Sequence, residues 1–209
     1  VDSSSSSLVV TSAFPGEGKS LVATNLAVSL AMSGATVILV DSDLRRPSLH
    51  DKFDISREPG LTSVLIDPST LDQALQDVGV PGLRVLTAGP LPPNPAELLG
   101  SRAMQNLHAR LNQLADVVIF DSPPVMVAVD GLVLAAEADG VIAIADLERA
   151  RKSEMQRLGE MLHQVNAKLV GVVLNKVPIQ RHRPYGYRYG KYGYGYGKYE
   201  IGRASCRER

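Results

Sequence analysis

The segment Ala13–Ser20, AFPGEGKS, has the glycine and lysine spacing of a loop that binds phosphate groups. Gly16 and Gly18 let backbone N–H groups turn toward phosphate oxygens, and the start of a following helix adds partial positive charge. Lys19 is expected to reach the β- and γ-phosphates, and the Ser20 hydroxyl to bind Mg²⁺. The alternative is a purely structural turn, which the complete Gly-Lys-Ser ending disfavours.

Acidic residues follow two other apolar runs. Asp41 and Asp43 come after the run Val37–Val40, and Asp121 comes directly after Val117–Phe120. An aspartate at a strand end is often only a turn former or a helix cap. Beside a phosphate-binding loop, such carboxylates suit the positioning of metal or water, or the acceptance of a hydroxyl proton. The run ending in Asp121 has the pattern of a carboxylate that holds Mg²⁺ through a water molecule.

Together these motifs predict a site for ATP and Mg²⁺. Asn175 and Lys176 stand at a strand end without the aspartate that would complete a guanine-binding signature, so we favour ATP over GTP. Asn175 is a candidate for a hydrogen bond to the base, and ordinary strand termination is the alternative. The expected nucleotide-binding residues are Pro15, Gly16, Glu17, Gly18, Lys19, Ser20, Leu21 and Asn175. The expected catalytic residues are Lys19, Asp41, Asp43 and Asp121, and the expected Mg²⁺ ligands are Ser20, Asp43 and Asp121.

These motifs need a scaffold of strands, and the body of the chain alternates short apolar runs with helical stretches. The expected strands are Leu8–Ser12, Thr36–Asp41, Leu83–Gly89, Asp116–Asp121, Asp139–Asp146 and Lys168–Lys176. Helices are expected over 20–34, from a cap at Asn94, from a cap at Ser101 to about Leu114, and over 152–166. Such alternation is typical of an α/β fold with a mostly parallel sheet and helices on both faces. Ligands bind at the carboxyl ends of such strands, where all three motifs stand.

Composition narrows the class of protein. The 209 residues carry 22 basic and 22 acidic side chains, so no overall charge favours nucleic acid or an acidic membrane surface. No apolar run in the sequence is long enough to span a membrane, and we expect no secretory signal. The single cysteine, Cys206, suits a reducing compartment.

Asp130 follows the second acidic motif, and we consider an interface role or a helix N-cap for it.

All seven tyrosines lie near the end of the chain, in a segment of alternating tyrosine, glycine and basic residues. They are Tyr185, Tyr187, Tyr189, Tyr192, Tyr194, Tyr196 and Tyr199. This alternation leaves no apolar face to bury, so we expect the segment to be disordered and the tyrosines to be accessible phosphate acceptors. Phosphorylation would reverse the basic charge of the segment. We therefore expect it to disassemble an oligomer.

With the motifs TSAFPGEGKS, ILVDSDLRRP and VVIFDSPP followed by a tyrosine cluster, the chain resembles the bacterial tyrosine kinases of capsular and exopolysaccharide biosynthesis. They form a branch of the phosphate-loop proteins that include the MinD- and ParA-like ATPases. The resemblance implies transfer of the γ-phosphate of ATP to C-terminal tyrosines of a neighbouring subunit in a ring. It implies nucleotide binding by Lys19 and Ser20, Mg²⁺ and proton transfer at Asp41 and Asp43, and a further carboxylate at Asp121. Which of Asp41 and Asp43 is the base stays open.

The resemblance also implies partners and a division of the chain. The family works with a membrane-spanning polysaccharide co-polymerase activator, at the cytoplasmic face of the cell membrane, and a tyrosine phosphatase is expected to oppose it. The family usually has a ring-forming helix with Glu-x-x-Arg-x-x-Arg before the first strand, and we expect that helix to be missing here. We expect a polar linker or truncated start at 1–7, the kinase domain at 8–178, the tyrosine tail at 179–200 and a non-native, adapter-like end at 201–209.

Two other functions compete with this interpretation. A tyrosine- and arginine-rich tail can stack on single-stranded nucleic acid, which would make the chain a binding module insensitive to ATP. An ATPase switch of the MinD and ParA type would hydrolyse ATP without phosphorylating tyrosine. That group carries a signature lysine early in its phosphate loop, where this chain has Ala13, Phe14 and Pro15. We therefore favour the kinase and expect no nucleic-acid partner.

Overall fold

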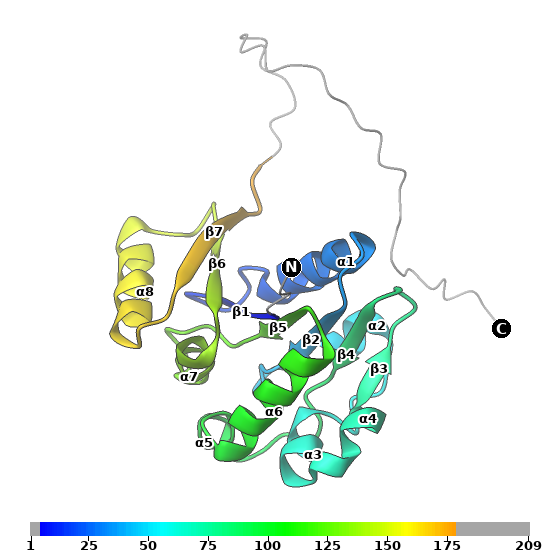
Figure 1. Ribbon diagram of the computed structural model, residues 1–209. Helices are drawn as coiled ribbons and strands as arrows, with labels where there is room; N and C mark the ends of the chain where they lie inside the picture. Colours follow the sequence, from blue (N-terminus) through cyan, green and yellow to red (C-terminus); the bar gives the residue numbers. More distant parts are fainter. Residues whose placement is uncertain (1–4, 179–209) are drawn as a thin grey trace, which may run out of the picture. The chain divides into compact units, whose positions relative to one another are not determined.

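Residues 5–178 fold around one seven-stranded sheet in the computed structural model, with strand order β3-β4-β2-β5-β1-β6-β7 (Figure 1). The strands are β1 Ser6–Ser12, β2 Val37–Asp41, β3 Leu75–Asp77, β4 Leu83–Leu86, β5 Val117–Asp121, β6 Gly140–Asp146 and β7 Leu169–Asn175. Every neighbouring pair is parallel except β3 and β4. Residues 1–4 and 179–209, with the tyrosine cluster and the expected disordered tail, lie outside the described residues.

Helices connect the strands and cover both faces of the sheet. They are α1 Lys19–Met32, α2 Leu49–Phe53, α3 Leu61–Ile66, α4 Leu71–Ala74, α5 Pro95–Leu99, α6 Arg102–Leu114, α7 Asp130–Glu137 and α8 Lys152–Gln164, with a 3₁₀ turn at Pro68–Thr70. The expected α/β fold with a mostly parallel sheet is therefore confirmed. No helix among residues 5–178 is long and apolar enough to cross a membrane.

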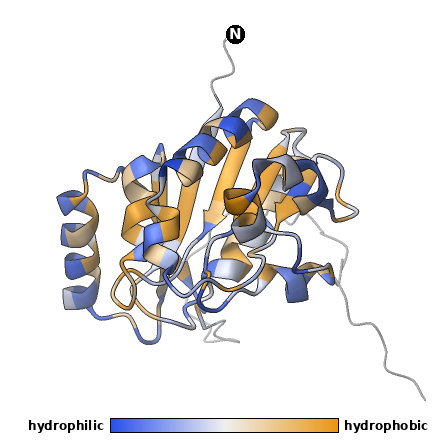
Figure 2. Ribbon diagram, turned by 90° about the horizontal axis from the view of Figure 1, so that it is seen from below, coloured by the Kyte–Doolittle hydropathy of each residue, from blue (hydrophilic) through white to orange (hydrophobic). Residues whose placement is uncertain are grey.

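The continuous apolar runs of the strands are explained by burial on two sides. Ile38 and Val40 of β2 pack on the side of α6, α7 and α8, and Val37 and Leu39 pack on the side of α1 and α2. All four are at most 1% exposed. In Figure 2 the apolar strands lie between helices whose outer sides are polar. Burial on both faces fixes the strand register and thereby the positions of the residues at the strand ends.

Two details of the sheet differ from expectation. The strand predicted over Leu83–Gly89 ends at Leu86, because the carbonyls of Thr87 and Ala88 accept hydrogen bonds from the first N–H groups of α3 instead of continuing the ladder. The short antiparallel strand β3 was not predicted, since three residues carry no readable alternation. The other five strands begin and end within two residues of their predicted bounds.

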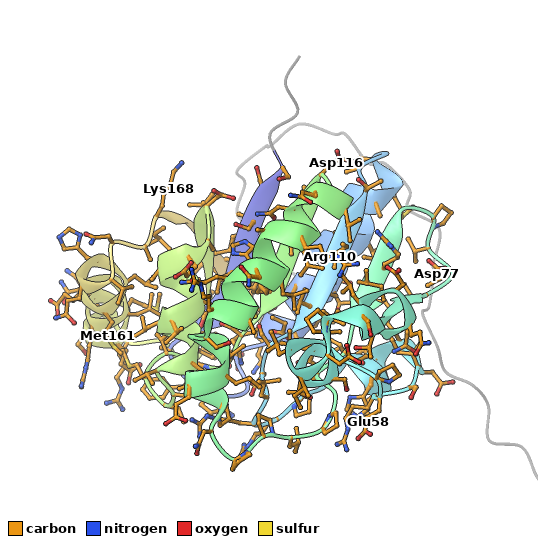
Figure 3. All side chains as sticks on the ribbon, turned by 60° about the horizontal axis from the view of Figure 1, so that its bottom comes forward. Glu58, Asp77, Arg110, Asp116, Met161 and Lys168 are labelled. Atoms are coloured by element: carbon orange, nitrogen blue, oxygen red, sulfur yellow. The ribbon has the colours of Figure 1, made fainter. Side chains whose placement is uncertain are left out.

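Helix caps set the ends of the connecting helices. The Ser101 hydroxyl accepts a hydrogen bond from the Met104 N–H at the start of α6, which confirms the predicted cap. Asn94 precedes α5 as predicted, although its side-chain amide donates to Glu97 rather than capping the backbone. At the amino ends of β2 and β5, the Asp116 carboxylate accepts hydrogen bonds from Thr36 (Figure 3). This edge of the sheet lies opposite the predicted motifs.

Candidate functional site

The phosphate loop connects β1 to α1. Gly16 has φ 81° and Gly18 has φ 95°, a left-handed backbone that favours glycine. No side chain caps the start of α1, so its first N–H groups are left for a ligand. Lys19, the first residue of α1, is only 7% exposed. A helix start with N–H groups that no side chain caps, together with an adjacent lysine, is an arrangement that can bind an anion, and nucleotide binding at this loop stays a prediction.

The buried side chain of Glu17 stabilises the phosphate loop. Its carboxylate accepts hydrogen bonds from the backbone N–H of Phe14 at 2.7 Å and of Asp146 at 3.3 Å. The residue is 5% exposed. The side chain of Glu17 therefore shapes the loop, and only its backbone is left to contact phosphate.

Residues at the carboxyl end of β7 donate hydrogen bonds to the same loop. The Asn175 side-chain amide donates to the Glu17 carbonyl at 2.9 Å, and the Lys176 ammonium donates to the Gly16 carbonyl at 2.7 Å. Lys176 also pairs with the Asp146 carboxylate at 2.8 Å. Asn175 was expected to contact the base or simply to end a strand; in the structure its amide N–H group supports the phosphate loop.

The two buried carboxylates stand side by side. Asp41 and Asp121 are register partners at the carboxyl ends of β2 and β5, and both are 0% exposed. One Asp41 oxygen, Oδ2, accepts hydrogen bonds from the N–H groups of Ser48 and Leu49, each at 2.9 Å. Oδ1 of Asp41 and both carboxylate oxygens of Asp121 have no hydrogen-bond partner within residues 5–178. Buried polar atoms are usually hydrogen-bonded, so carboxylate oxygens without partners are consistent with a site that binds water or a cation.

Burial raises the pKa of both Asp41 and Asp121. The pKa of Asp41 rises to about 7 because burial disfavours the charged form and because Asp121 is close; two backbone hydrogen bonds oppose the rise. Burial also raises the pKa of Asp121 to about 6, against the lowering influence of Ser20 and Lys19. A bound cation would favour the ionised forms of both.

Asp43 differs from these two because it faces a cavity. The cavity has a volume of about 430 Å³, and its lining includes Lys19, Ser20, Asp43, Arg45, Pro123 and Pro124. Asp43 Oδ1 accepts a 3.0 Å hydrogen bond from the N–H of Arg46. The cavity therefore brings together the loop lysine, the loop serine and one of the two aspartates after β2.

The donor set fits Mg²⁺ bound together with a nucleotide. Mg²⁺ usually takes one or two carboxylates, a hydroxyl, phosphate oxygens and water. Ser20 lines the cavity, and the two carboxylate oxygens of the neighbouring Asp121 have no hydrogen-bond partner within residues 5–178. Within the part of the chain that the structure describes, no group of three or more His, Cys, Asp or Glu side chains could hold a metal by itself. The residues thus fit an ion whose other ligands come from the nucleotide and water.

Three residues of the site were not assigned by sequence reasoning. Lys176 had been considered only as part of a guanine signature. Arg45 lay inside the second motif without a role. Asp130 was considered as an interface residue or a helix N-cap; in the structure the N-cap of α7 is Val129, and Asp130 is a buried first residue paired with Arg45. Pairings across 85 residues of sequence leave no local signal.

Leu21, expected near the nucleotide, is 51% exposed on α1.

The chain matches a known family model and named relatives. The model of the CobQ/CobB/MinD/ParA nucleotide binding domain matches residues 8–188. The tyrosine-protein kinase YwqD of Bacillus subtilis (strain 168) is 42% identical over 190 residues, which are 91% of this chain and 80% of YwqD. The tyrosine-protein kinase CpsD of Streptococcus agalactiae is 33% identical over 187 residues, which are 88% of this chain and 81% of CpsD.

A solved structure has the same fold. The kinase domain of the Escherichia coli tyrosine kinase ETK aligns with a TM-score of 0.82 at 32% identity, covering 90% of this chain and 74% of that chain. The family resemblance read from the motifs is thereby confirmed.

Proposed function

The chain belongs to the bacterial tyrosine-protein kinases, within the CobQ/CobB/MinD/ParA nucleotide-binding domains, and we propose that it phosphorylates the tyrosines of its own tail with ATP and Mg²⁺. The observation that supports this most is the cavity that Lys19, Ser20 and Asp43 line together, next to buried carboxylate oxygens without partners. Phosphoryl transfer needs such a combination of positioned cations and a proton acceptor.

In the proposed step, the γ-phosphorus of ATP forms a bond to a tyrosine oxygen while its bond to the β,γ-bridging oxygen breaks. ADP leaves with the bridging oxygen, and the tyrosine proton passes to a carboxylate. Lys19 and the free N–H groups at the start of α1 bind the phosphates and oppose their negative charge. Because the step involves little covalent chemistry for the protein, its main contribution is to position these groups.

We assign the proton acceptor to Asp43 rather than Asp41. Asp43 lines the cavity, whereas Asp41 is fully buried and already accepts two backbone hydrogen bonds. A general base must come within hydrogen-bond reach of the proton that it removes. Ser20 and Asp121 would then hold Mg²⁺, with Asp41, the register partner of Asp121, as a further carboxylate for the ion. The ion supplies charge neutralisation at the β- and γ-phosphate oxygens when bound.

The acceptors in this proposal are Tyr185, Tyr187, Tyr189, Tyr192, Tyr194, Tyr196 and Tyr199. The chain leaves β7 at Asn175, which itself contacts the phosphate loop. From there an extended chain of ten residues, to Tyr185, reaches roughly 35 Å. The acceptors can therefore reach the cavity of the same subunit or of a neighbour, and transfer between subunits of a ring is our choice between them.

The proposal includes partners and a cellular role. Like the kinases that it resembles, the chain would regulate the synthesis and export of a capsular or extracellular polysaccharide. It would act in the cytoplasm at the cell membrane, bound to a membrane-spanning co-polymerase activator, and a tyrosine phosphatase would reverse its modification. An activator's cytoplasmic segment added to the purified chain should therefore increase tail phosphorylation.

Substitution of each aspartate separates their roles. We expect Asp43→Asn to lower the rate of tyrosine phosphorylation by about 10²–10⁴-fold, the contribution of a general base, while ADP binding is retained. Asp41→Asn and Asp121→Asn should instead reduce the dependence of nucleotide binding on Mg²⁺. The rate is measured with a Tyr-Gly peptide, and affinity by titration with ADP at several Mg²⁺ concentrations. An Asp43→Asn protein with an unchanged rate would refute the assignment.

A further inference from the structure

Arg45 is held by a buried carboxylate from a distant part of the chain. Its Nε donates to Asp130 Oδ2 at 2.7 Å and its Nη2 donates to Asp130 Oδ1 at 3.2 Å. The Asp130 side chain is 0% exposed, whereas that of Arg45 is 49% exposed. This two-point contact fixes the plane of the guanidinium group as well as its position.

The carboxylate that holds Arg45 is itself firmly placed. Asp130 is the first residue of α7, and the next residue, Gly131, packs tightly against the segment after β5. A Cβ atom at Gly131 would lie 2.8 Å from the carbonyl oxygen of Pro123. The start of α7 is therefore fixed relative to the carboxyl end of β5, where Asp121 stands. Through Asp130, Arg45 is fixed to that same end of the sheet.

Only one edge of the guanidinium is used by this pair. Within residues 5–178, Nη1 of Arg45 takes part in no hydrogen bond or ion pair. Arg45 lines the cavity that also contains Lys19, Ser20 and Asp43. A delocalised cation with free donors in a cavity built for phosphate suits an oxyanion of a phosphoryl group.

A purely structural pair would be a costly choice here. A buried carboxylate must be desolvated, and packed apolar side chains often serve equally well in stabilising a fold. An apolar pair could also join the loop after β2 to α7. What an apolar pair could not do is hold a cation in the cavity.

We propose that Asp130 is a positioning residue that holds Arg45 against the cavity, and that Arg45 binds the γ-phosphoryl group of ATP. This inference rests on ATP as the phosphoryl donor in the proposed function. It adds a second cation, besides Lys19, at the transferred group. The charge that develops on the oxygens of that group during transfer would be shared between the two.

The test compares binding of ADP with binding of AMP-PNP, a non-hydrolysable analogue that carries the γ-phosphoryl group, both with Mg²⁺. Arg45→Ala should weaken AMP-PNP binding by about tenfold or more, the usual effect of losing a hydrogen bond to a charged group, and leave ADP binding within about twofold. Arg45→Lys should recover only part of the loss, because lysine cannot make the two-point contact. Arg46→Ala is the matched control, since Arg46 lines the same cavity and forms no ion pair with a carboxylate among residues 5–178. It should change both affinities by the same factor.

The role of Asp130 is tested by combining variants. Asp130→Asn should weaken AMP-PNP binding selectively, and it should cause no further loss in a chain that already carries Arg45→Ala. If Asp130→Asn alone does not fold, the double variant Asp130→Ala with Arg45→Ala removes both charges and should match the nucleotide affinities of Arg45→Ala. A further loss in either double variant would overturn the positioning role.

The outcomes separate this inference from the proposed function. If Arg45→Ala weakens ADP and AMP-PNP equally, or if Arg46→Ala has the same selective effect, Arg45 does not bind the γ-phosphoryl group and the inference is overturned. If the unsubstituted chain binds neither nucleotide, the proposed function fails and the inference fails with it. Selective loss with Arg45→Ala, absent with Arg46→Ala, supports the inference and, within the proposed function, the use of ATP as phosphoryl donor.

Discussion

Without ligand, the buried carboxylates of Asp41 and Asp121 should make the protein less stable than a variant that lacks one of the two charges. Substituting Asp41 by Asn keeps the size of the side chain and an oxygen for the two backbone N–H groups that Asp41 Oδ2 now serves. It removes the charge that burial and Asp121 oppose. We therefore predict that Asp41→Asn raises the free energy of unfolding at neutral and alkaline pH.

The magnitude follows from the pKa of Asp41, which lies near 3.8 in an unfolded chain and at about 7 in the folded protein. Between these values the unfolded chain has released a proton that the folded chain retains, so stability falls as the pH rises through this window. At ~1.4 kcal/mol per pH unit, the loss by pH 8 is about 4 kcal/mol. The Asn NH₂ group would occupy the Oδ1 position, where Asp41 has no hydrogen-bond partner within residues 5–178, and burying these donors should offset about 1 kcal/mol, leaving an expected gain of about 3 kcal/mol.

The assay is urea unfolding at pH values from 4 to 8, without nucleotide and with Mg²⁺ removed. The difference in unfolding free energy between Asp41→Asn and the unsubstituted chain should be small near pH 4 and grow toward pH 7. Below pH 4 both proteins should lose stability, because Asp67, Asp116 and Asp139 accept hydrogen bonds that lower their pKa, and this stabilisation is lost as they protonate. Asp72→Asn, at an exposed position of α4, controls for the loss of one negative charge.

The reasoning would be refuted by a pH-independent effect. If Asp41→Asn changes stability by the same amount at pH 4 and pH 8, the side chain does not carry a pKa raised by folding. If the variant is less stable at pH 8, burial of the charge is not the dominant cost at this position. The predicted pH dependence would mean that the buried charge of Asp41 destabilises the protein without ligand, and that binding of nucleotide and Mg²⁺ offsets this loss of stability.

Three further outcomes are expected. Gly18→Ala should lower stability by about 1–3 kcal/mol and weaken ADP binding, because φ is 95° there and the added methyl would clash with the Asn175 amide; unchanged ADP binding would contradict this. Lys176→Met should weaken ADP binding by about tenfold through loss of its bonds to the phosphate loop, whereas Lys168→Met at the other end of β7 should not. Leu111→Ala, at a fully buried position of α6, should reduce the free energy of unfolding in urea by about 2–5 kcal/mol; a smaller loss would mean that the core there relaxes into the space.

Much of the fold was predictable because the strands are buried on both faces. A run such as Val37–Val40 can be apolar at every position only in a sheet with helices on each side, and that identified the sheet. The phosphate loop was predictable because glycine spacing, lysine and serine are all local in sequence. The predicted strand Leu83–Gly89 was too long. Thr87 and Ala88 have side chains that favour a strand, but their carbonyls accept hydrogen bonds from α3.

The site was predictable only as far as its motifs are local. Asp41, Asp43 and Asp121 stood out at strand ends, yet their sequence gave no sign that Asp43 faces the cavity while Asp41 does not. The support of the phosphate loop by Lys176 joins residues 160 positions apart. Contacts of that kind depend on how the strands are ordered in the sheet, which a single sequence does not specify.

Mass spectrometry of the tail, after the purified chain has been incubated at high concentration with ATP and Mg²⁺, tests the central claim most directly. A Lys19→Met protein, which should lose its contact with the phosphates, is treated in the same way. Our account predicts phosphate on tyrosines between Tyr185 and Tyr199 in the unsubstituted chain and none in Lys19→Met. ATP hydrolysis without phosphotyrosine, even after an activator's cytoplasmic segment and an upstream arginine-bearing helix are supplied, would contradict it and identify an ATPase switch instead.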